Sequence, residues 1–403
     1  LTERFDGSIG SASVLFPMGG AWQSTPECGM AARIPVGPGK ATKTTSLMTM
    51  GYDPKAAFWS PYHGSQYAVL ESLAKILALG GDPRTARLTF QEYFERTSSA
   101  EAWGKPAAAL LGALQAQLAC GTAAIGGKDS MSGTFQNLNV PPTLVSFAVA
   151  VTDDDRVRGG SLSGPDNTLV LVQTPWLADN TPDWAAFHLN VASVLAISGA
   201  GRVRAAYPLT AGGIAAALSK MAFGNRVGAV IDAGALPFIR LPSVFGVARK
   251  TAGTVEDAIL DAKGDCLFAP LYGSLILEIA AEVDELPALA GEHSTENWVA
   301  IGKTSAEPSI TVGRHTRPLD ASQLAWEKPL ARVFPPVSGI IPAPLPAFAC
   351  APAKAASGTA GTSGTTSTHK SAPTILSAKE KPLVVLPVFP GTNCEYDMAR
   401  AFT

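Results

Sequence analysis

Charged side chains are scarce in this chain. Asp, Glu, Lys and Arg together make up 16% of its 403 residues, whereas soluble domains average about 25%. Hydrophobic residues account for 46%. A surface with so few charges is poorly solvated over its full extent. We therefore expect part of it to be covered by another domain or another chain.

The sequence also lacks an excess of charge of either sign and any long apolar run. It has 31 basic and 33 acidic residues and a formal net charge of −2, which provides no electrostatic attraction for nucleic acid or an anionic membrane. Its most apolar stretches are interrupted by Pro, Asn, Arg or Asp before they reach the roughly twenty residues that a transmembrane helix needs. The sequence therefore predicts neither a nucleic-acid partner nor a membrane span.

Cysteine is also scarce in this chain. The five cysteines are scattered, odd in number and never spaced C-x-x-C. This pattern disfavours a disulfide framework and a zinc site, and it favours a reducing, cytoplasmic compartment. The first residues show neither an initiator Met nor the basic and apolar regions of a signal peptide. We expect the sequence to be part of a longer chain.

Helical and strand patterns predict an α/β (α+β) protein with two layered units. Apolar residues recur at helical spacing in residues 65–79 and 107–118, and a third helix runs from residue 214 to 221. Apolar and β-branched runs typical of buried strands lie at residues 123–125, 143–151, 168–172, 274–279 and 298–302. An acidic, glycine-rich stretch at residues 153–164 marks the boundary between the units.

The composition changes after the second unit. Residues 337–381 consist largely of Pro, Ala, Ser, Thr and Gly, which cannot bury a core and predict a flexible linker. Beyond it, residues 383–388 have the pattern of a strand and residues 394–402 that of a helix. We expect this C-terminal segment to be disordered or loosely docked, because one strand and one helix do not complete a core.

Residues 126–130 carry the clearest chemical signal. Two glycines after a short strand let backbone N–H groups approach an anion, Lys128 adds positive charge and Ser130 adds a hydroxyl donor. The segment is not a P-loop, and a plain Gly-Gly turn explains it equally well. Gly212 and Gly213 similarly suit either an anion at a helix N-terminus or close helix packing.

Six segments together resemble one family. They are LTERFDGSIGS (1–11), FWSPYHGSQYAVLESLAKILALGGD (58–82), GGKDSMSGTF (126–135), PPTLVSFAVAVTD (141–153), TAGGIAAALSKMAFG (210–224) and VLPVFPGTNCEYDMARAF (385–402). In sequence and order they resemble the large, single-chain phosphoribosylformylglycinamidine synthase of purine biosynthesis. The resemblance covers the second half of its synthetase region and the opening of its glutaminase domain.

The resemblance implies a fold and a division of the chain. Aminoimidazole ribonucleotide synthetase-like domains are expected at residues 1–155 (N-type) and 156–335 (C-type), with the linker at 336–381. The truncated start of a class I glutamine amidotransferase domain is expected at residues 382–403. The partners of this chain would be the first synthetase half and the remainder of the glutaminase domain.

The resemblance also implies a reaction and its cofactors. The family joins formylglycinamide ribonucleotide, ATP and ammonia from glutamine to give the amidine, ADP, phosphate and glutamate, with Mg²⁺ and a site that excludes water. A nucleotide or substrate phosphate is expected near Gly126, Gly127, Lys128, Asp129 and Ser130. Gly212, Gly213, His63 and Asp6 are further binding candidates, although His63 also suits a structural role and Asp6 a solvated loop.

Three positions argue against catalysis within this half. Glu71 is a candidate metal ligand by resemblance, but Lys75 stands where some family members have Asn, and an i,i+4 ion pair explains the spacing equally well. Ala211 replaces the acidic residue that often precedes the Gly-Gly pair, which removes an oxygen ligand for Mg²⁺. Cys394 lies too early in a glutaminase domain to be its nucleophile.

Three functions remain open at this stage. The first is a portion of the ATP-dependent ligase that is inactive alone and exposes an apolar face where the other half docks. The second is a nucleotide-binding or scaffold half without turnover, which completes the active site of the first half. The third, a stand-alone aminoimidazole ribonucleotide synthetase relative acting as a homodimer, is disfavoured by the glutaminase-like C-terminal segment.

Overall fold

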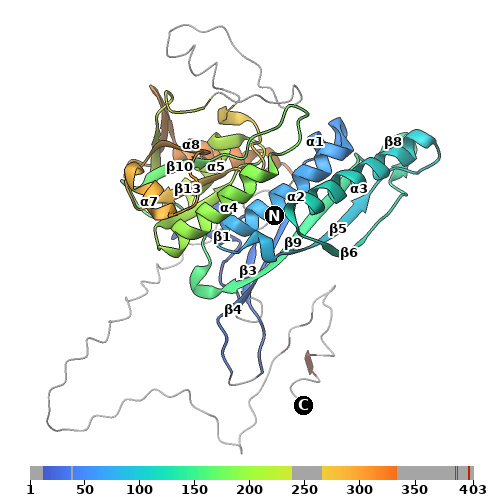
Figure 1. Ribbon diagram of the computed structural model, residues 1–403, viewed down its shortest axis with the longest axis horizontal. Helices are drawn as coiled ribbons and strands as arrows, with labels where there is room; N and C mark the ends of the chain where they lie inside the picture. The colour runs from blue at the N-terminus through green and yellow to red at the C-terminus, as the bar shows by residue number, and fades with distance from the viewer. Residues whose placement is uncertain are drawn as a thin grey trace, which may run out of the picture. The chain divides into compact units, whose positions relative to one another are not determined.

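Two β-sheets covered by helices form the described part of this protein. The computed structural model describes residues 12–37, 40–237 and 266–333, together with residues 386, 388, 398 and 399. The chain divides into two units, residues 1–339 and 340–403. Almost all described residues belong to the first unit (Figure 1). Its mixture of strands and helices confirms the predicted α/β class.

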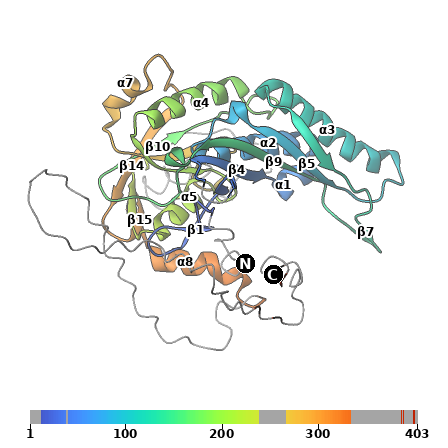
Figure 2. The ribbon, with the colours of Figure 1, turned by 90° about the horizontal axis from the view of Figure 1, so that it is seen from below.

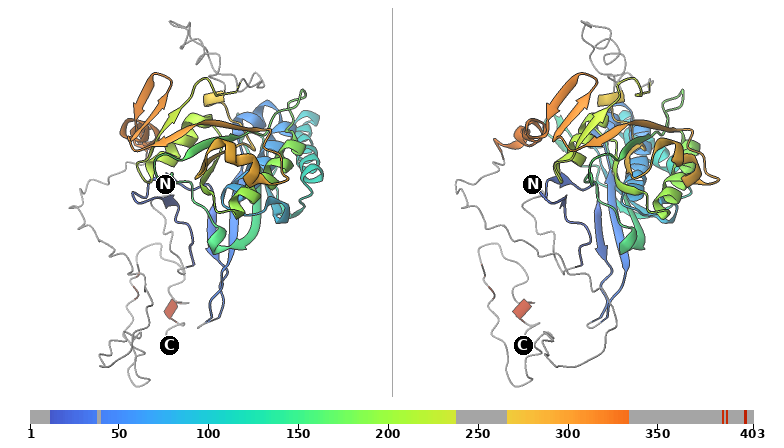
Figure 3. Two further views of the ribbon diagram at one scale, coloured as in Figure 1. Left: turned by 60° about the vertical axis from the view of Figure 1, so that its left-hand side comes forward. Right: turned by 90° about the vertical axis from the view of Figure 1, so that its left-hand side faces the viewer.

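The N-terminal sheet has five strands in the order β3-β4-β9-β5-β6. Their bounds are Met30–Arg33 (β3), Thr44–Gly51 (β4), Arg87–Tyr93 (β5), Ala124–Lys128 (β6) and Thr143–Asp153 (β9). All pairs are antiparallel except β5 and β6, which run parallel, so the carboxyl ends of these two strands lie next to each other. The β3–β4 hairpin projects beyond the helices (Figure 3). Two small strand pairs accompany the sheet: Met18–Gly19 (β1) with Thr25–Pro26 (β2), and Thr134–Phe135 (β7) with Leu138–Asn139 (β8).

Helices α2 (Pro61–Ala78) and α3 (Ala100–Cys120) lie side by side over one face of this sheet, preceded by the short α1 (Pro54–Trp59) (Figure 1). The helices predicted at residues 65–79 and 107–118 are confirmed, but both begin earlier than predicted. The side chains of Ser60 and Ser99 accept backbone N–H groups from His63 and Ala102. These N-caps, rather than the apolar spacing, determine where each helix starts.

The opposite face of the N-terminal sheet is apolar and exposed. Met48 and Met50 of β4 are 46% and 44% exposed, and Val151 of β9 is 56% exposed. Met48 lies opposite Val149 in the antiparallel ladder, and Met50 lies opposite Phe147. The scarcity of charge in the sequence thus has a structural counterpart, a sheet face that displays Met and Val side chains to solvent.

The second sheet has seven strands in the order β11-β13-β10-β14-β12-β15-β16. Their bounds are Thr168–Val172 (β10), Val203–Pro208 (β11), Gly228–Ile231 (β12), Leu275–Ile279 (β13), Trp298–Ser305 (β14), Ser309–Val312 (β15) and His315–Pro318 (β16). The strands predicted at residues 168–172, 274–279 and 298–302 are confirmed as β10, β13 and β14. Helices of this part are α4 (Trp184–Gly199), α5 (Gly213–Phe223), α7 (Leu286–Ala290) and α8 (Leu319–Glu327).

Every residue of β10 is buried because helices cover both faces of the second sheet. Val170 and Val172 belong to one core cluster with Phe187 of α4. Leu169 and Leu171 alternate with them and belong to the other cluster, which includes α5. Figure 2 shows α4 and α7 on one side of this sheet and α5 and α8 on the other.

The two sheets share a core and polar contacts. One apolar cluster contains residues of both sheets and of α2 and α4. The hydroxyl of Tyr67 on α2 donates to the carbonyl of Asn180, and the hydroxyl of Tyr272 donates to the carboxylate of Asp53. The rings of Tyr67 and Tyr272 stack with their centroids 5.5 Å apart. These contacts hold the two layered parts together as one unit.

Several predictions fall wholly or mostly outside the described residues. They concern Asp6, the linker at 336–381, Cys394, the strand at 383–388 apart from residues 386 and 388, and the helix at 394–402 apart from residues 398 and 399, which are helical. Within the described ranges, no helix is long and apolar enough to cross a membrane. Cys28 and Cys120 are free thiols.

Candidate functional site at the ends of strands β5 and β6

The segment 126–130 lies at the edge of the N-terminal sheet. The expected loop after a short strand is wrong for its first three residues, because Gly126, Gly127 and Lys128 are still part of β6 and are exposed. Pairing with β5 continues through them because Gly127 has no side chain. A Cβ there would lie 2.5 Å from the carbonyl oxygen of Phe90. The two glycines thus extend an edge strand and leave its outer side open.

Beyond the end of β6, Ser130 remains hydrogen-bonded to Phe94, the residue that follows β5. The carbonyl of Ser130 accepts the N–H of Phe94 at 2.9 Å, and the Phe94 carbonyl accepts the N–H of Gly133 at 2.9 Å. The hydroxyls of Ser130 and Ser132 are 3.0 Å apart. The backbone thus brings Lys128, Asp129 and two hydroxyl-bearing residues to the point where the two parallel strands end.

Glu92 is the residue of this site that sequence reasoning missed. It is the penultimate residue of β5, only 5% exposed, and its Oε1 atom is buried without a hydrogen-bond partner. Burial raises the pKa of Glu92 to about 7, and the negative charge of Asp129 contributes to that rise. The sequence did carry one signal for Glu92. Side chains alternate between the two faces of a strand, so Glu92 lies on the same helix-facing side as Leu88 and Phe90. A buried carboxylate with a raised pKa beside a second acid is characteristic of functional sites.

Replacing Glu92 by Gln is expected to stabilise the protein above neutral pH. The raised pKa means that the folded protein binds this proton more tightly than the unfolded chain, so the cost of Glu92 appears as pH rises from about 4.5 to about 7. After discounting for partial solvation, Glu92→Gln should gain roughly 1 kcal/mol at pH 8 and nothing at pH 4.

Urea denaturation at a series of pH values measures this difference. Glu296→Gln, at an exposed position, is the matched control and should leave the free energy of unfolding unchanged. A Glu92→Gln protein that is less stable than wild type at pH 8 would show that the carboxylate has a partner that stabilises its charge.

Glu71 and Lys75 form a buried ion pair. Lys75 Nζ lies 2.6 Å from Glu71 Oε1 and also donates to the Met50 carbonyl at 2.7 Å. Glu71 Oε2 accepts the N–H of Tyr52 at 3.2 Å. Burial raises the pKa of Glu71, and the Lys75 ammonium opposes this shift. Both carboxylate oxygens already have partners, so the ion-pair interpretation is favoured over the expected metal ligand.

No group of three or more His, Cys, Asp or Glu side chains could hold a metal ion within the described residues. Glu92 and Asp129 are the two carboxylates brought together at the ends of β5 and β6. Since Mg²⁺ in proteins is often bound by one or two carboxylates together with phosphate oxygens, these two side chains fit the ion better than Glu71 does.

His63 is held by partners within the chain. Its Nδ1 atom lies 2.8 Å from the Ser60 hydroxyl, and its Nε2 atom lies 3.0 Å from the Asp179 carbonyl. The ring also packs against Trp59, with centroids 4.8 Å apart. Both ring nitrogens are engaged. This favours a structural role, in which His63 links α2 to the segment at Asp179, rather than contact with a substrate.

Gly212 and Gly213 open helix α5 in left-handed conformations, with φ of +89° and +58°. A Cβ on Gly213 would lie 2.6 Å from the Leu267 carbonyl oxygen and 2.7 Å from that of Ala269. These two carbonyls approach the helix N-terminus so closely that only glycine fits. The geometry favours close packing over an anion site at this helix.

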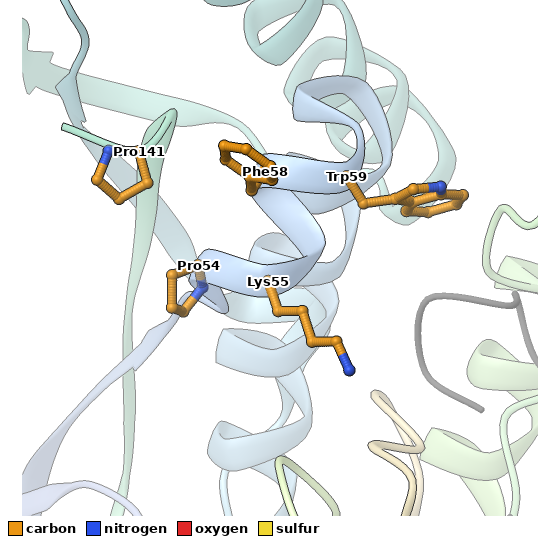
Figure 4. Close-up of a pocket in the computed structure, with 5 residues that line it drawn as sticks. All are labelled: Pro54, Lys55, Phe58, Trp59 and Pro141. Atoms are coloured by element: carbon orange, nitrogen blue, oxygen red, sulfur yellow. The ribbon is translucent and has the colours of Figure 1, made fainter. Parts of the chain in front are cut away.

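A separate groove of about 730 Å³ lies beside α1 and has a different character. It is lined by Pro54, Lys55, Phe58, Trp59 and Pro141. Figure 4 shows Phe58 between Pro141 and Trp59, with the Lys55 side chain extending away from Pro141. The lining contains no carboxylate or hydroxyl group, so this groove does not supply the polar groups that the ends of β5 and β6 bring together.

Comparison with known proteins gives one family match. Residues 178–315 match the family described as AIR synthase related protein, C-terminal domain. These residues include α4, α5 and strands β11 to β15 of the second sheet.

Curated relatives are phosphoribosylformylglycinamidine synthase subunits named PurL. The chain is 26% identical to the protein of Granulibacter bethesdensis over 208 residues, which cover 47% of this chain and 28% of that protein. It is 24% identical to that of Rhodopseudomonas palustris over 326 residues, which cover 74% and 42%. The chain thus spans less than half the length of the curated relatives it matches.

Solved structures of Thermotoga maritima share the fold at low sequence identity. The PurLQS structure matches with a TM-score of 0.52 and 14% identity, covering 70% of this chain and 45% of that chain. PurL complexed with ATP matches with a TM-score of 0.52 and 15% identity, covering 69% and 44%. The chain is therefore similar in sequence to PurL proteins and shares the AIR synthase-like fold of the PurL structures, and its residues 178–315 match the AIR synthase-related C-terminal domain.

Proposed function

We propose that this chain is the second synthetase half of a large, single-chain phosphoribosylformylglycinamidine synthase. That enzyme converts formylglycinamide ribonucleotide, ATP and glutamine into the amidine, ADP, phosphate and glutamate. The observation that carries the proposal is the meeting of the Gly126–Ser130 residues with the buried Glu92 at the ends of two parallel strands. The T. maritima PurL structures complexed with ATP and with FGAR support it by fold.

The proposal assigns a domain to each part of the chain. The N-type synthetase domain occupies residues 1–155, the C-type domain 156–335, the linker 336–381 and the start of a glutaminase domain 382–403. Ammonia would come from glutamine at the completed glutaminase domain. A cytoplasmic location, where purine nucleotides are made, agrees with this assignment.

The residues at the strand ends have complementary tasks in holding a phosphate. Lys128 supplies positive charge and Ser130 a hydroxyl donor, both at an exposed strand end. Gly126 has open space where its Cβ would be, and β6 is an edge strand, so a ligand can approach the outer side of its backbone. These groups bind and orient the phosphate.

Glu92 and Asp129 would hold Mg²⁺ at this site. The unpartnered Oε1 atom of Glu92 and the adjacent Asp129 carboxylate provide negative charge that no described cation neutralises. When bound, Mg²⁺ neutralises phosphate charge and orients the phosphate groups. Since Mg²⁺ stabilises the ionised carboxylate, its binding is expected to lower the pKa of Glu92 below 7.

Isothermal titration with Mg-ATP and Mg-ADP tests this assignment. Wild-type chain should show saturable binding, and Lys128→Ala should weaken it by about tenfold or more, because a charge-assisted contact to phosphate is lost. Lys43→Ala is the matched control. Lys43 is exposed and paired with Asp155, and neither residue belongs to the segment 126–130. Equal affinity of the Lys128→Ala and wild-type proteins, or no binding by wild type, would contradict the site.

The exposed apolar face of the N-terminal sheet is the surface we assign to the first synthetase half. A face that displays Met48, Met50 and Val151 to solvent is poorly solvated for a free surface. A tagged first half from a large single-chain relative should capture the wild-type chain. Met48→Lys with Val149→Lys should abolish capture, because lysines would have to be buried in the contact.

The control for this capture experiment is a pair of lysines on helix α3. Leu111 and Leu118 are 60% and 71% exposed, and α3 covers the other face of the sheet. Leu111→Lys with Leu118→Lys should leave capture intact. Capture of the sheet-face variant at wild-type level would exclude this face as the docking surface.

The alternative is a non-catalytic half that binds nucleotide or serves as a scaffold. The buried Glu71–Lys75 pair favours it, because the ammonium engages a carboxylate that a metal would otherwise use. Incubation of the chain together with the first synthetase half, Mg-ATP, formylglycinamide ribonucleotide and ammonium chloride separates the two. ADP release that is lost in Lys128→Ala supports a catalytic part for this half, whereas ADP release that is unchanged in Lys128→Ala supports the alternative.

A further inference from the structure

A polar cavity of about 310 Å³ lies where the segment before β3 meets the second part of the unit. Its walls include Glu27, Ser161 and Arg204, which come from three distant stretches of sequence. Val14, Leu15 and Phe16 form an apolar side of the same cavity. None of its lining residues belongs to the site at the ends of β5 and β6.

Glu27 brings a carboxylate to this cavity without a cation to neutralise it. Its Oε2 atom accepts the N–H of Gly160 at 2.9 Å. No described lysine or arginine forms an ion pair with it, and burial raises its pKa to about 7. The hydroxyl of Ser161 is also buried and has no hydrogen-bond partner. Buried polar groups without partners are uncommon, and each one invites a ligand or an ordered water.

Arg204 brings the opposite charge to the same cavity. It lies on β11, is exposed, and forms no ion pair with any described residue. No ion pair joins Arg204 to Glu27, although both line the cavity, so each charge is available to a ligand. A cavity that keeps an anion and a cation apart is complementary to a ligand that carries both charges.

We propose that this cavity binds a small zwitterion of the amino-acid class. The ligand's ammonium group would contact Glu27, and its carboxylate would contact Arg204. An aliphatic side chain would lie against Val14, Leu15 and Phe16. The cavity volume of about 310 Å³ is sufficient for a ligand of this size. The proposal is independent of nucleotide binding at Lys128, because the two sites share no residue.

Ligand affinity depends on pH through Glu27. The thiol of Cys28 and the phenol of Tyr207 lie near it, but burial raises both pKa values, that of Cys28 to about 12, so both groups are neutral near pH 7. The Lys75 ammonium opposes the rise in the pKa of Cys28 and is itself paired with Glu71. Affinity should therefore rise between pH 6 and pH 8 as Glu27 ionises.

Titration calorimetry with L-leucine and two truncated analogues tests the proposal. 3-Methylbutylamine lacks the carboxylate and 4-methylpentanoate lacks the ammonium group. Wild-type chain should bind L-leucine saturably and each analogue at least tenfold more weakly, because each analogue leaves one charge of the cavity without a partner. Equal binding of the three compounds, or no saturable binding of L-leucine between pH 6 and 8, would overturn the proposal.

Variants assign the binding to the cavity. Glu27→Gln keeps an acceptor for the Gly160 N–H and should weaken L-leucine at least tenfold while removing its pH dependence. Arg204→Gln should weaken L-leucine to a similar degree, weaken 4-methylpentanoate further and leave the binding of 3-methylbutylamine unchanged. Arg202→Gln, an exposed arginine just before β11, is the control and should bind as wild type does. Unchanged L-leucine affinity in both cavity variants would place the ligand elsewhere and refute the assignment.

Discussion

Replacing Lys75 by Met is expected to destabilise the protein by about 3 kcal/mol at pH 8. The Lys75 and Glu71 side chains are only 14% and 7% exposed, so the variant leaves a buried carboxylate without its cation. The Met50 carbonyl loses its donor as well. Because burial already raises the pKa of Glu71, the cost should be smaller at pH 5, where the carboxyl group is more readily protonated.

Urea denaturation of three variants checks this result. Lys75→Met with Glu71→Gln should recover most of the lost stability, because no uncompensated charge remains and Gln still accepts the Tyr52 N–H. Lys303→Met removes an exposed pair, with Glu282 at 3.1 Å, and should cost less than about 1 kcal/mol. A Lys75→Met protein as stable as wild type, with no dependence on pH, would show that Glu71 has another partner.

Replacing Gly213 by Ala is expected to cost about 3 kcal/mol or more. The residue is left-handed, with φ of +58°, which costs an L-residue about 1–2 kcal/mol. The new Cβ would also lie 2.6 Å from one carbonyl oxygen and 2.7 Å from another, both part of the backbone at residues 267 and 269. A backbone cannot rotate away as a side chain can, so the helix start or that segment must shift.

Gly121 provides the matched control for this experiment. It is also left-handed, with φ of +67°, but nothing lies within 4 Å of the position of its Cβ. Gly121→Ala should therefore cost only the backbone term of about 1–2 kcal/mol. Thermal or urea unfolding of both variants separates conformational strain from steric contact. Equal costs for the two would mean that the carbonyls at 267 and 269 do not constrain Gly213.

The strands were predictable where side-chain pattern alone determines them. Residues 168–172 are uniformly apolar, and they form β10 because helices cover both faces of the second sheet. Residues 143–151 are apolar or small throughout and form most of β9, which lies in the middle of its sheet. The first residues of the helices were harder to predict, because Ser60 and Ser99 cap them through single hydrogen bonds that apolar spacing does not reveal.

The candidate site was predictable in part. The glycines, Lys128, Asp129 and Ser130 were identified from local chemistry and family resemblance. Glu92 was missed because helix α3 separates it from these residues in the sequence, and only the parallel pairing of β5 with β6 brings it close to them. The cavity with Glu27 and Arg204 could not be predicted from the sequence either, because its walls come from separate stretches of the chain.

The Glu71–Lys75 spacing shows which part of an interaction the sequence can predict and which part only the structure can decide. The sequence allowed either a metal ligand or an i,i+4 ion pair. The structure favours the ion pair, because burial makes the ammonium and the carboxylate depend on each other and both oxygens of Glu71 are engaged. Spacing alone carries no information about burial, and burial decides which interaction is stable.

The most direct test of the central claim is hydrogen–deuterium exchange of the chain with and without saturating Mg-ATP. If the nucleotide binds at the ends of β5 and β6, amide exchange should slow in peptides covering residues 88–94 and 124–132. Peptides covering residues 12–33, around the Glu27 cavity, should exchange at an unchanged rate. Protection confined to other segments, or no change at saturating Mg-ATP, would contradict the account.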